Sequence, residues 1–295
     1  MFATLALLAT VQVVDLLPGL YAAESVEPTA ARVARFKTDV LEPNHTLFAD
    51  TGIVLNDAQL GAYLNAVDPQ LPAVRAMEQT LEASIPPIAA SFASAFPKFR
   101  PQSVVIYLTP SLGDFDGMTQ DVDGHHGLLL GVDNIAAEHA PLGVLIDHEL
   151  FHIYHHDINP AFFPTKSEND LYQYGIYRQL WAEGLATYVS RQLNPGTTEA
   201  TALFSQRLAT LPAAQVQQLA CFVEQRFDSR SANDANLLFD GGQHPPGLPA
   251  RGGYLIGYLL AQDLGTSHTL AELADMSGDT LEHALHTRVQ TLCGS

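Results

Sequence analysis

Apolar residues recur at helical spacing along much of this 295-residue chain. Between residues 24 and 100 the pattern predicts mostly helices, and Asn56-Asp57 can cap one of them. Residues 71–96 keep the same spacing. Pro86-Pro87 interrupts this stretch and predicts the end of one helix and the start of another, because proline lacks a backbone N–H and clashes with the preceding turn.

Two later segments have the composition of strands. Residues 103–109 are Ser-Val-Val-Ile-Tyr-Leu-Thr, and residues 127–132 are Gly-Leu-Leu-Leu-Gly-Val. β-Branched, aromatic and apolar runs of this length favour strands. The glycines and aspartates between the two segments predict a turn-rich loop.

A helix is expected from about Pro141 to His156. Proline suits its first turn, where the missing N–H costs nothing, and Asn159-Pro160 predicts its end. Its apolar positions fall on one face: Leu142, Leu145, Ile146, Leu150 and Ile153. We expect this face to pack on the sheet.

The remainder of the chain is again helical in pattern. Helices are expected near residues 198–211 and 213–226, followed by a long loop over residues 227–251. Two short capped helices are expected in the C-terminal part, the first at Thr269-x-x-Glu272 and the second over residues 279–292. The predicted fold class is therefore α+β, predominantly helical with a small mixed sheet beside the helix at residues 141–156.

The composition is that of a protein able to bury a substantial core. The chain is 47% hydrophobic and has a formal net charge of −18 with only 14 lysines and arginines. This charge argues against nucleic acid and anionic membranes as partners, because their phosphates would be repelled. Cys221 and Cys293 are too few for a disulfide framework, and the sequence leaves open whether they pair.

The most specific motif is His148-Glu149-Leu-Phe-His152, inside the helix predicted above. Histidines four positions apart lie on one helix face, so both imidazoles can reach one ion. Glu149 is turned about 100° round the helix, where it misses the ion but can act on a nearby water. This spacing supplies two ligands and a base, which zinc-dependent hydrolysis requires.

A third ligand is expected from Glu183 in the helical segment Trp181-Ala-Glu-Gly-Leu-Ala-Thr-Tyr188. Gly184 is small and would allow this helix to pack closely on the first. The two motifs together resemble the gluzincin zinc metallopeptidases, and among them the bacterial predicted zinc-dependent proteases with an E-G-L-A-type second motif. The resemblance covers about half the chain. It departs from the usual pattern at Thr187, since no aspartate follows Glu183 by four residues.

The resemblance implies a role for each matching residue. His148, His152 and Glu183 would bind Zn²⁺, and Glu149 would be the general base. Tyr254 is the first choice as the residue that stabilises the oxyanion, with Tyr258 and His244 as alternatives.

The expected activity is zinc-dependent hydrolysis of peptide or protein substrates, more in the endo mode because no exopeptidase motif is present. The edge strand that binds substrate is expected at residues 127–132. Two other functions stay open: a zinc hydrolase of a non-peptide amide, and a non-enzymatic binding module that zinc stabilises.

The N-terminus favours an exported protein, periplasmic or secreted. Residues 1–23 are strongly apolar and resemble a signal peptide, although Asp15 interrupts them and no lysine or arginine precedes Arg32. The alternatives are a buried N-terminal helix and a cytoplasmic protein. No segment is long and apolar enough for stable membrane insertion. The expected organisation is thus a signal peptide, a helical N-terminal region at residues 24–100, and a zincin-like catalytic region with a helical C-terminal lobe at residues 101–295.

Overall fold

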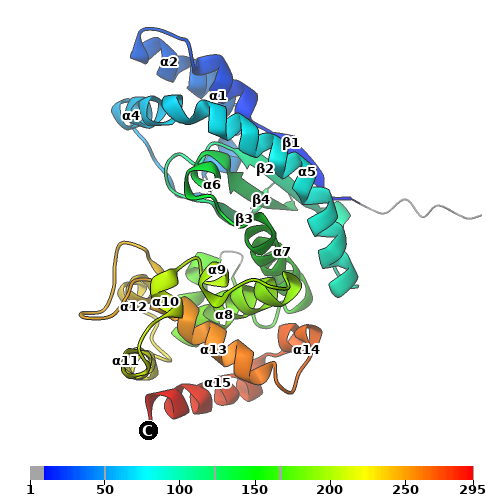
Figure 1. The fold of residues 1–295 in the computed structure, drawn as a ribbon, viewed down its shortest axis with the longest axis vertical. Coiled ribbons are helices and arrows are strands. Elements are labelled where there is room, and N and C mark those ends of the chain that lie inside the picture. The colour runs from blue at the N-terminus through cyan, green and yellow to red at the C-terminus, as the bar shows by residue number, and fades with distance from the viewer. Residues whose placement is uncertain (1–9, 50, 123, 166–167, 295) are drawn as a thin grey trace, which may run out of the picture. The chain divides into compact units, whose positions relative to one another are not determined.

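The computed structural model describes residues 10–49, 51–122, 124–165 and 168–294, which are mostly helical with one small sheet (Figure 1). This confirms the predicted α+β class in which helices predominate. The chain divides into two compact units, the first ending at Leu142 and the second beginning at Gly143. The sequence had indicated a boundary near residue 100 instead. The two units are described separately below.

The first unit contains a mixed four-stranded sheet in the order β1-β2-β4-β3. The strands are β1 (Gln12–Asp15), β2 (Val104–Thr109), β3 (Gly117–Val122) and β4 (His125–Gly131). β1, β2 and β4 are parallel, whereas β3 pairs antiparallel with β4. The strands predicted at residues 103–109 and 127–132 are thus present within two residues of their expected bounds.

Two expectations about this sheet are wrong. β4 is no edge strand, since it pairs with β2 on one side and with β3 on the other. The expected turn-rich loop contains β3, because six of the residues between the turns at Gly113 and Gly124, both with positive φ, form an extended strand. The edges of the sheet are β1 and β3.

The helices of the first unit precede and follow the central strands. They are α1 (Leu17–Ala23), α2 (Thr29–Phe36), α3 (His45–Ala49), α4 (Asp57–Val67), α5 (Leu71–Ala95) and α6 (Val132–Glu138), with a π-helical turn at Lys37–Leu41 and 3₁₀ turns at Asp68–Gln70 and Pro101–Ser103. Asn56 caps α4 as predicted, with its side chain accepting from Gln59 N at 3.0 Å.

α5 is one continuous helix, so the break predicted at Pro86-Pro87 is wrong. Both prolines are exposed, whereas Leu81, Ile85 and Phe92 on the opposite face are buried. The carbonyl groups that lose their helical partners therefore face solvent, where water can satisfy them. The buried face keeps its helical spacing and offsets the cost of the two prolines.

The segment expected as a signal peptide is part of the first unit from residue 10 onward, and its residues 1–9 lie outside the described residues. β1 pairs with β2, and Leu17 and Leu20 of α1 are buried. Cleavage after Ala23 would remove this edge strand and helix. The export signal stays a prediction.

The second unit is helical. Its elements are α7 (Leu142–Ile158, beginning at the last residue of the first unit), a 3₁₀ segment (Glu168–Tyr174), α8 (Ile176–Leu193), α9 (Glu199–Ala202), α10 (Gln206–Ala209), α11 (Ala213–Glu224), α12 (Ala232–Phe239), α13 (Gly252–Leu264), α14 (Leu270–Asp275) and α15 (Gly278–Cys293). α12 lies within the loop expected over residues 227–251, so that part of the prediction is wrong. Among the helices described, none is both long and apolar enough to span a bilayer.

The partner of Gly184 differs from the one expected. α8 and α13 lie side by side (Figure 1), and a Cβ on Gly184 would lie 2.0 Å from the carbonyl carbon of Gly257. A Cβ on Gly257 would in turn lie 2.1 Å from the carbonyl oxygen of Leu180. The small residue therefore lets α8 approach α13, rather than α7.

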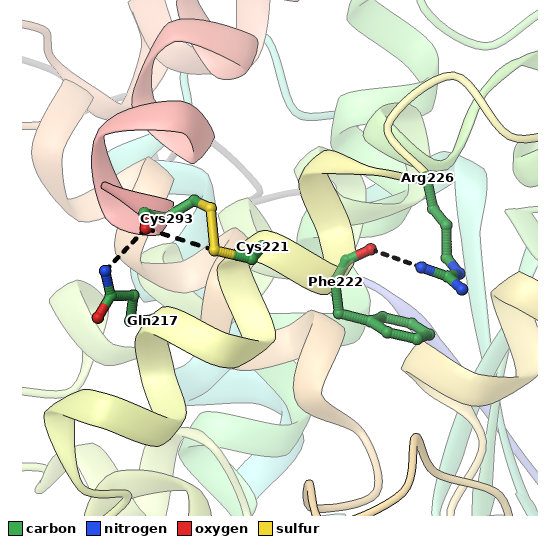
Figure 2. Close-up of a disulfide and its surroundings, with 5 residues drawn as sticks. All are labelled: Gln217, Cys221, Phe222, Arg226 and Cys293. Atoms are coloured by element: carbon green, nitrogen blue, oxygen red, sulfur yellow. Dashed lines mark hydrogen bonds between the residues drawn. A yellow bond between two sulfur atoms is a disulfide. The ribbon is translucent and has the colours of Figure 1, made fainter. Parts of the chain in front are cut away.

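Cys221 and Cys293 form a disulfide that ties the C-terminal end of α15 to α11 (Figure 2). Gln217 Nε2 of α11 also donates to the carbonyl oxygen of Cys293 at 2.8 Å. This resolves the pairing that the sequence left open.

Candidate metal centre

Two histidines of α7 face the same point. The helix is buried from Val144 to His155, and His148 and His152 are only 7% and 4% exposed. Their Nε2 atoms are 3.0 Å apart, and the rings meet edge to face. Two adjacent turns of one helix therefore present two nitrogen donors to one small volume, as the four-residue spacing predicts.

Glu183 of α8 completes the group. Its Oε2 atom lies 3.5 Å from His148 Nε2 and 3.6 Å from His152 Nε2. One ligand atom from each of the three residues lies within 4.8 Å of the others, so this group could hold a metal ion. The three residues predicted as ligands are thus brought together by two separate helices.

The electrostatics of the group favour a charged Glu183 carboxylate beside a neutral His148 imidazole. Burial alone would raise the pKa of Glu183, but the charge of His152 and hydrogen bonding to His148 and His152 hold that pKa below its usual range. Burial lowers the pKa of His148, against an opposing effect of Glu183. Deprotonated imidazoles and an ionised carboxylate are the forms that bind a metal.

The donor set and its spacing fit a tetrahedral ion. Ligand atoms about 2.1 Å from a tetrahedral zinc ion lie roughly 3.4 Å from each other. The observed spacings of 3.0, 3.5 and 3.6 Å bracket that value. Two nitrogens and one carboxylate oxygen suit zinc or another borderline cation better than calcium or magnesium, which prefer oxygen ligands.

Glu149 is 8% exposed and lies next to the first histidine. Its position on α7 follows from the helix, which turns it away from the direction shared by His148 and His152. A buried carboxylate beside the ligands is a group able to take up a proton there. Its role as general base stays a prediction.

The structure separates the three candidates for the oxyanion residue. Tyr254 is in the first turn of α13 and is half-buried. Burial raises its pKa, and the charges of Glu183 and Glu149 raise it further. The hydroxyl of Tyr254 therefore lies within electrostatic reach of both the metal group and Glu149.

Tyr258 and His244 are placed differently. Tyr258 is fully buried, and its hydroxyl accepts from Gln262 Nε2 at 3.1 Å and from the Arg191 guanidinium. His244 is exposed, with its Nδ1 3.1 Å from the carbonyl oxygen of Pro245. Tyr254 is thus the candidate for which the structure gives an electrostatic link to Glu183 and Glu149.

Arg251 is a residue of this site that sequence reasoning missed. Its guanidinium carbon lies 4.4 Å from the centre of the Tyr254 ring. Its charge helps to lower the pKa of His148 and opposes the rise in the pKa of Tyr254. In the sequence Arg251 is simply an arginine before Gly252-Gly253, and nothing there distinguishes it from an ordinary loop arginine.

A second missed feature links α7 to the C-terminal end of α8. Asn194 Nδ2 donates to Asp147 Oδ2 at 2.8 Å, directly before His148 in the chain. Burial raises the pKa of Asp147 to about 7, although the hydrogen bond from Asn194 opposes this rise. Asn194 also fills the space beside Gly143, where a Cβ would lie 2.2 Å from its Oδ1 atom.

The support around the ligands differs from a fully hydrogen-bonded zinc site. His148 Nδ1 has no hydrogen-bond partner among the described residues, whereas ligand histidines commonly donate from this nitrogen. Thr187, which stands where an aspartate was looked for, donates to the carbonyl oxygen of Glu183 at 2.8 Å. That bond fixes the helix rather than a ligand imidazole.

His155, in the last turn of α7, is fully buried. The chain turns after Asn159 and brings Phe162 and Phe163 onto the imidazole, 5.3 and 4.8 Å from its centre. Burial in this aromatic cluster lowers the pKa of His155 to about 3.

Comparison of the chain with protein-family models, with curated proteins and with solved structures gives no match in any of the three. The resemblance to gluzincins therefore rests on the motif residues and their geometry.

Proposed function

We propose that this protein is a zinc-dependent peptidase, acting more in the endo mode. The observation that carries the proposal is the group of His148, His152 and Glu183, whose ligand atoms lie within 4.8 Å of one another. The buried Glu149 beside it supports an enzymatic rather than a structural site, because a structural site has no use for a base.

His148, His152 and Glu183 would hold the zinc ion. When bound there, zinc supplies a Lewis acid that polarises a carbonyl group and makes water more acidic. The Glu149 carboxylate would take a proton from the attacking water as its oxygen bonds to the carbonyl carbon. Glu149 would then return that proton to the amine nitrogen as the C–N bond breaks. The Tyr254 hydroxyl would donate a hydrogen bond to the carbonyl oxygen while it is negative.

Substrate class and location follow from the net charge and the disulfide. A peptide or protein is the proposed substrate, and the net charge of −18 favours basic segments over nucleic acid or anionic membranes. The disulfide between Cys221 and Cys293 supports an oxidising compartment such as the periplasm or the exterior.

The first test is the metal content of the purified protein. We expect about one zinc per chain in the wild type and a loss in Glu183→Ala, because catalytic zinc sites commonly use three protein ligands. Glu224→Ala is the matched control: it removes a half-buried glutamate of α11, in the same unit but outside the metal group. A folded wild type that neither contains zinc nor binds it on reconstitution would overturn the proposal.

The second test separates the peptidase from its two rivals. Glu149→Gln should keep zinc and abolish cleavage of a denatured protein substrate. If the wild type binds zinc but cleaves only non-peptide amides, the metal site stands and the substrate class is wrong. If Glu149→Gln changes neither turnover nor zinc content, the site is structural.

A further inference from the structure

The disulfide of the second unit joins the last turn of α11 to the last residue of α15 (Figure 2). Cys221 and Cys293 are both partly exposed. The buried residues of α15 are Leu281, Leu285 and Val289, which all precede the cysteine. The covalent bond therefore holds the end of α15 on α11 beyond the last buried side chain of the helix.

α11 packs in turn on the start of α13. Leu219 of α11, which precedes Cys221 by two residues, is fully buried. A Cβ on Gly252, the first residue of α13, would lie 2.7 Å from Leu219 Cδ1 and 2.8 Å from Leu219 Cδ2. The leucine side chain thus lies directly against the backbone of α13, and a shift of α11 releases or displaces this end of α13.

α13 sets the position of α8, which carries Glu183. A Cβ on Gly257 would lie 2.1 Å from the carbonyl oxygen of Leu180, and one on Gly184 would lie 2.0 Å from the carbonyl carbon of Gly257. Backbones packed this closely transmit a displacement rather than absorb it. A continuous series of contacts therefore leads from the disulfide through α11 and α13 to the residue next to the proposed ligand.

We propose that the Cys221–Cys293 disulfide controls how tightly the second unit binds zinc, because it holds the helices that position Glu183. This inference rests on the proposed zinc site. Metal–ligand distances tolerate a change of only about 0.2 Å, so a small displacement of α8 weakens the carboxylate as a ligand. The protein thus binds zinc tightly in an oxidising compartment, where the bond forms, and weakly in a reducing one.

The control is reversible by thiol–disulfide exchange. A dithiol breaks the S–S bond, leaves two cysteine thiols and is itself oxidised to a cyclic disulfide. An exported peptidase with this control binds its metal firmly only after it has left the reducing cytoplasm, so it does not cleave proteins there.

The test compares the zinc affinity of the oxidised wild type with that of Cys221→Ser/Cys293→Ser, measured by competition with a chelating dye. Serine is used because free thiolates would themselves bind zinc. Leu203→Ala is the matched control. Leu203 is a buried leucine directly after α9, in the same unit but outside the series of contacts described above, and its truncation lowers stability.

We expect the serine variant to bind zinc about tenfold more weakly than the oxidised wild type, the lower end of the loss seen when groups that orient metal ligands are removed. Leu203→Ala should bind zinc as the wild type does. Equal zinc affinity in the serine variant and the wild type, or an equal loss in Leu203→Ala, would overturn the inference and leave the metal site intact. No zinc binding by the oxidised wild type would instead overturn the proposed function.

Leu219→Ala tests the series of contacts with the disulfide in place, and it also serves if the serine variant does not fold. It removes the contact with Gly252 and should weaken zinc binding, whereas Leu219→Met conserves the side-chain volume and should not. Added to the serine variant, Leu219→Ala should weaken zinc binding little further, because both changes interrupt the same contacts. Wild-type zinc affinity in Leu219→Ala, or two losses that multiply, would overturn the inference.

Discussion

Gly184 of α8 and Gly257 of α13 are in backbone-to-backbone contact. A Cβ on Gly184 would lie 2.0 Å from the carbonyl carbon of Gly257, and within 2.3 Å of its Cα atom. Gly184 follows the proposed ligand Glu183, and Gly257 lies three residues after Tyr254. One helix contact thus sets the separation between the elements that carry a metal ligand and the oxyanion candidate.

Gly257→Ala should destabilise the second unit and loosen the metal site together. The added methyl group would meet the carbonyl oxygen of Leu180 at 2.1 Å, so α13 must move away from α8. Overpacking of this kind costs about 3 kcal/mol. Urea unfolding and zinc titration measure the two effects.

The control for this substitution is Gly241→Ala, because nothing lies within 4 Å of the position that its Cβ would take. It should leave both the unfolding midpoint and zinc affinity unchanged. A Gly257→Ala variant with wild-type stability would contradict the close packing of α8 on α13.

The three proposed ligands could be predicted from sequence because their positions depend on residue spacing within single helices. Histidines at i and i+4 on one helix need only that helix to form, and Glu183 needs a second helix that returns to it. The burial of His155 could not be predicted in this way, since it depends on Phe162 and Phe163 folding back over the end of α7. No periodicity within the helix contains that information.

The difference between local patterns and contacts formed only in the folded chain also explains the errors in the fold prediction. The strand at Gly117–Val122 has side chains that are mostly half-buried, so its sequence lacks the apolar run that marks β2 and β4. Pro86-Pro87 ends helices in isolation, but the buried face of α5 supports the helix through them. The contact of Arg251 with Tyr254 was missed because it depends on a left-handed backbone and on ring contacts that form only in the folded chain.

The buried His155 should make the protein acid-sensitive. Its pKa is about 3 when folded, against 6.5 for the unfolded residue. Between these values the unfolded chain binds a proton that the folded chain does not, so stability is constant above pH 6.5 and falls as the pH drops toward 3. From pH 7 to pH 5 the free energy of unfolding should fall by about 2 kcal/mol.

In His155→Phe, measured in a chelator without metal, the free energy of unfolding should fall by about 2 kcal/mol less over this pH range than in the wild type. The reason is that phenylalanine does not titrate. His283→Gln removes an exposed histidine of α15 and should follow the wild-type pH profile. Identical slopes for the wild type and His155→Phe would show that His155 becomes charged without unfolding.

Loss of the disulfide should destabilise the second unit. The bond closes a loop with a sequence separation of 72 residues. Chain-entropy arguments give about 4 kcal/mol for a loop of this length, as an effect on the unfolded chain. The double variant Cys221→Ser/Cys293→Ser should therefore unfold at lower urea concentration than the oxidised wild type and match the reduced wild type. If the reduced wild type were as stable as the oxidised protein, the disulfide would not stabilise the protein by restricting the unfolded chain.

Leu20→Ala distinguishes a retained N-terminus from a cleaved one. Leu20 is 2% exposed in α1, and the neighbouring Gly19 lies so close to Val40 that a Cβ would come within 2.5 Å of its Cγ2 atom. If residues 10–23 remain in the mature protein, Leu20→Ala should cost about 3 kcal/mol in urea unfolding. Val54→Ala is the control, since Val54 is 89% exposed and should show no effect. If export removes the segment, Leu20→Ala should leave the stability of the purified protein unchanged, and its intact mass should lack the first 23 residues.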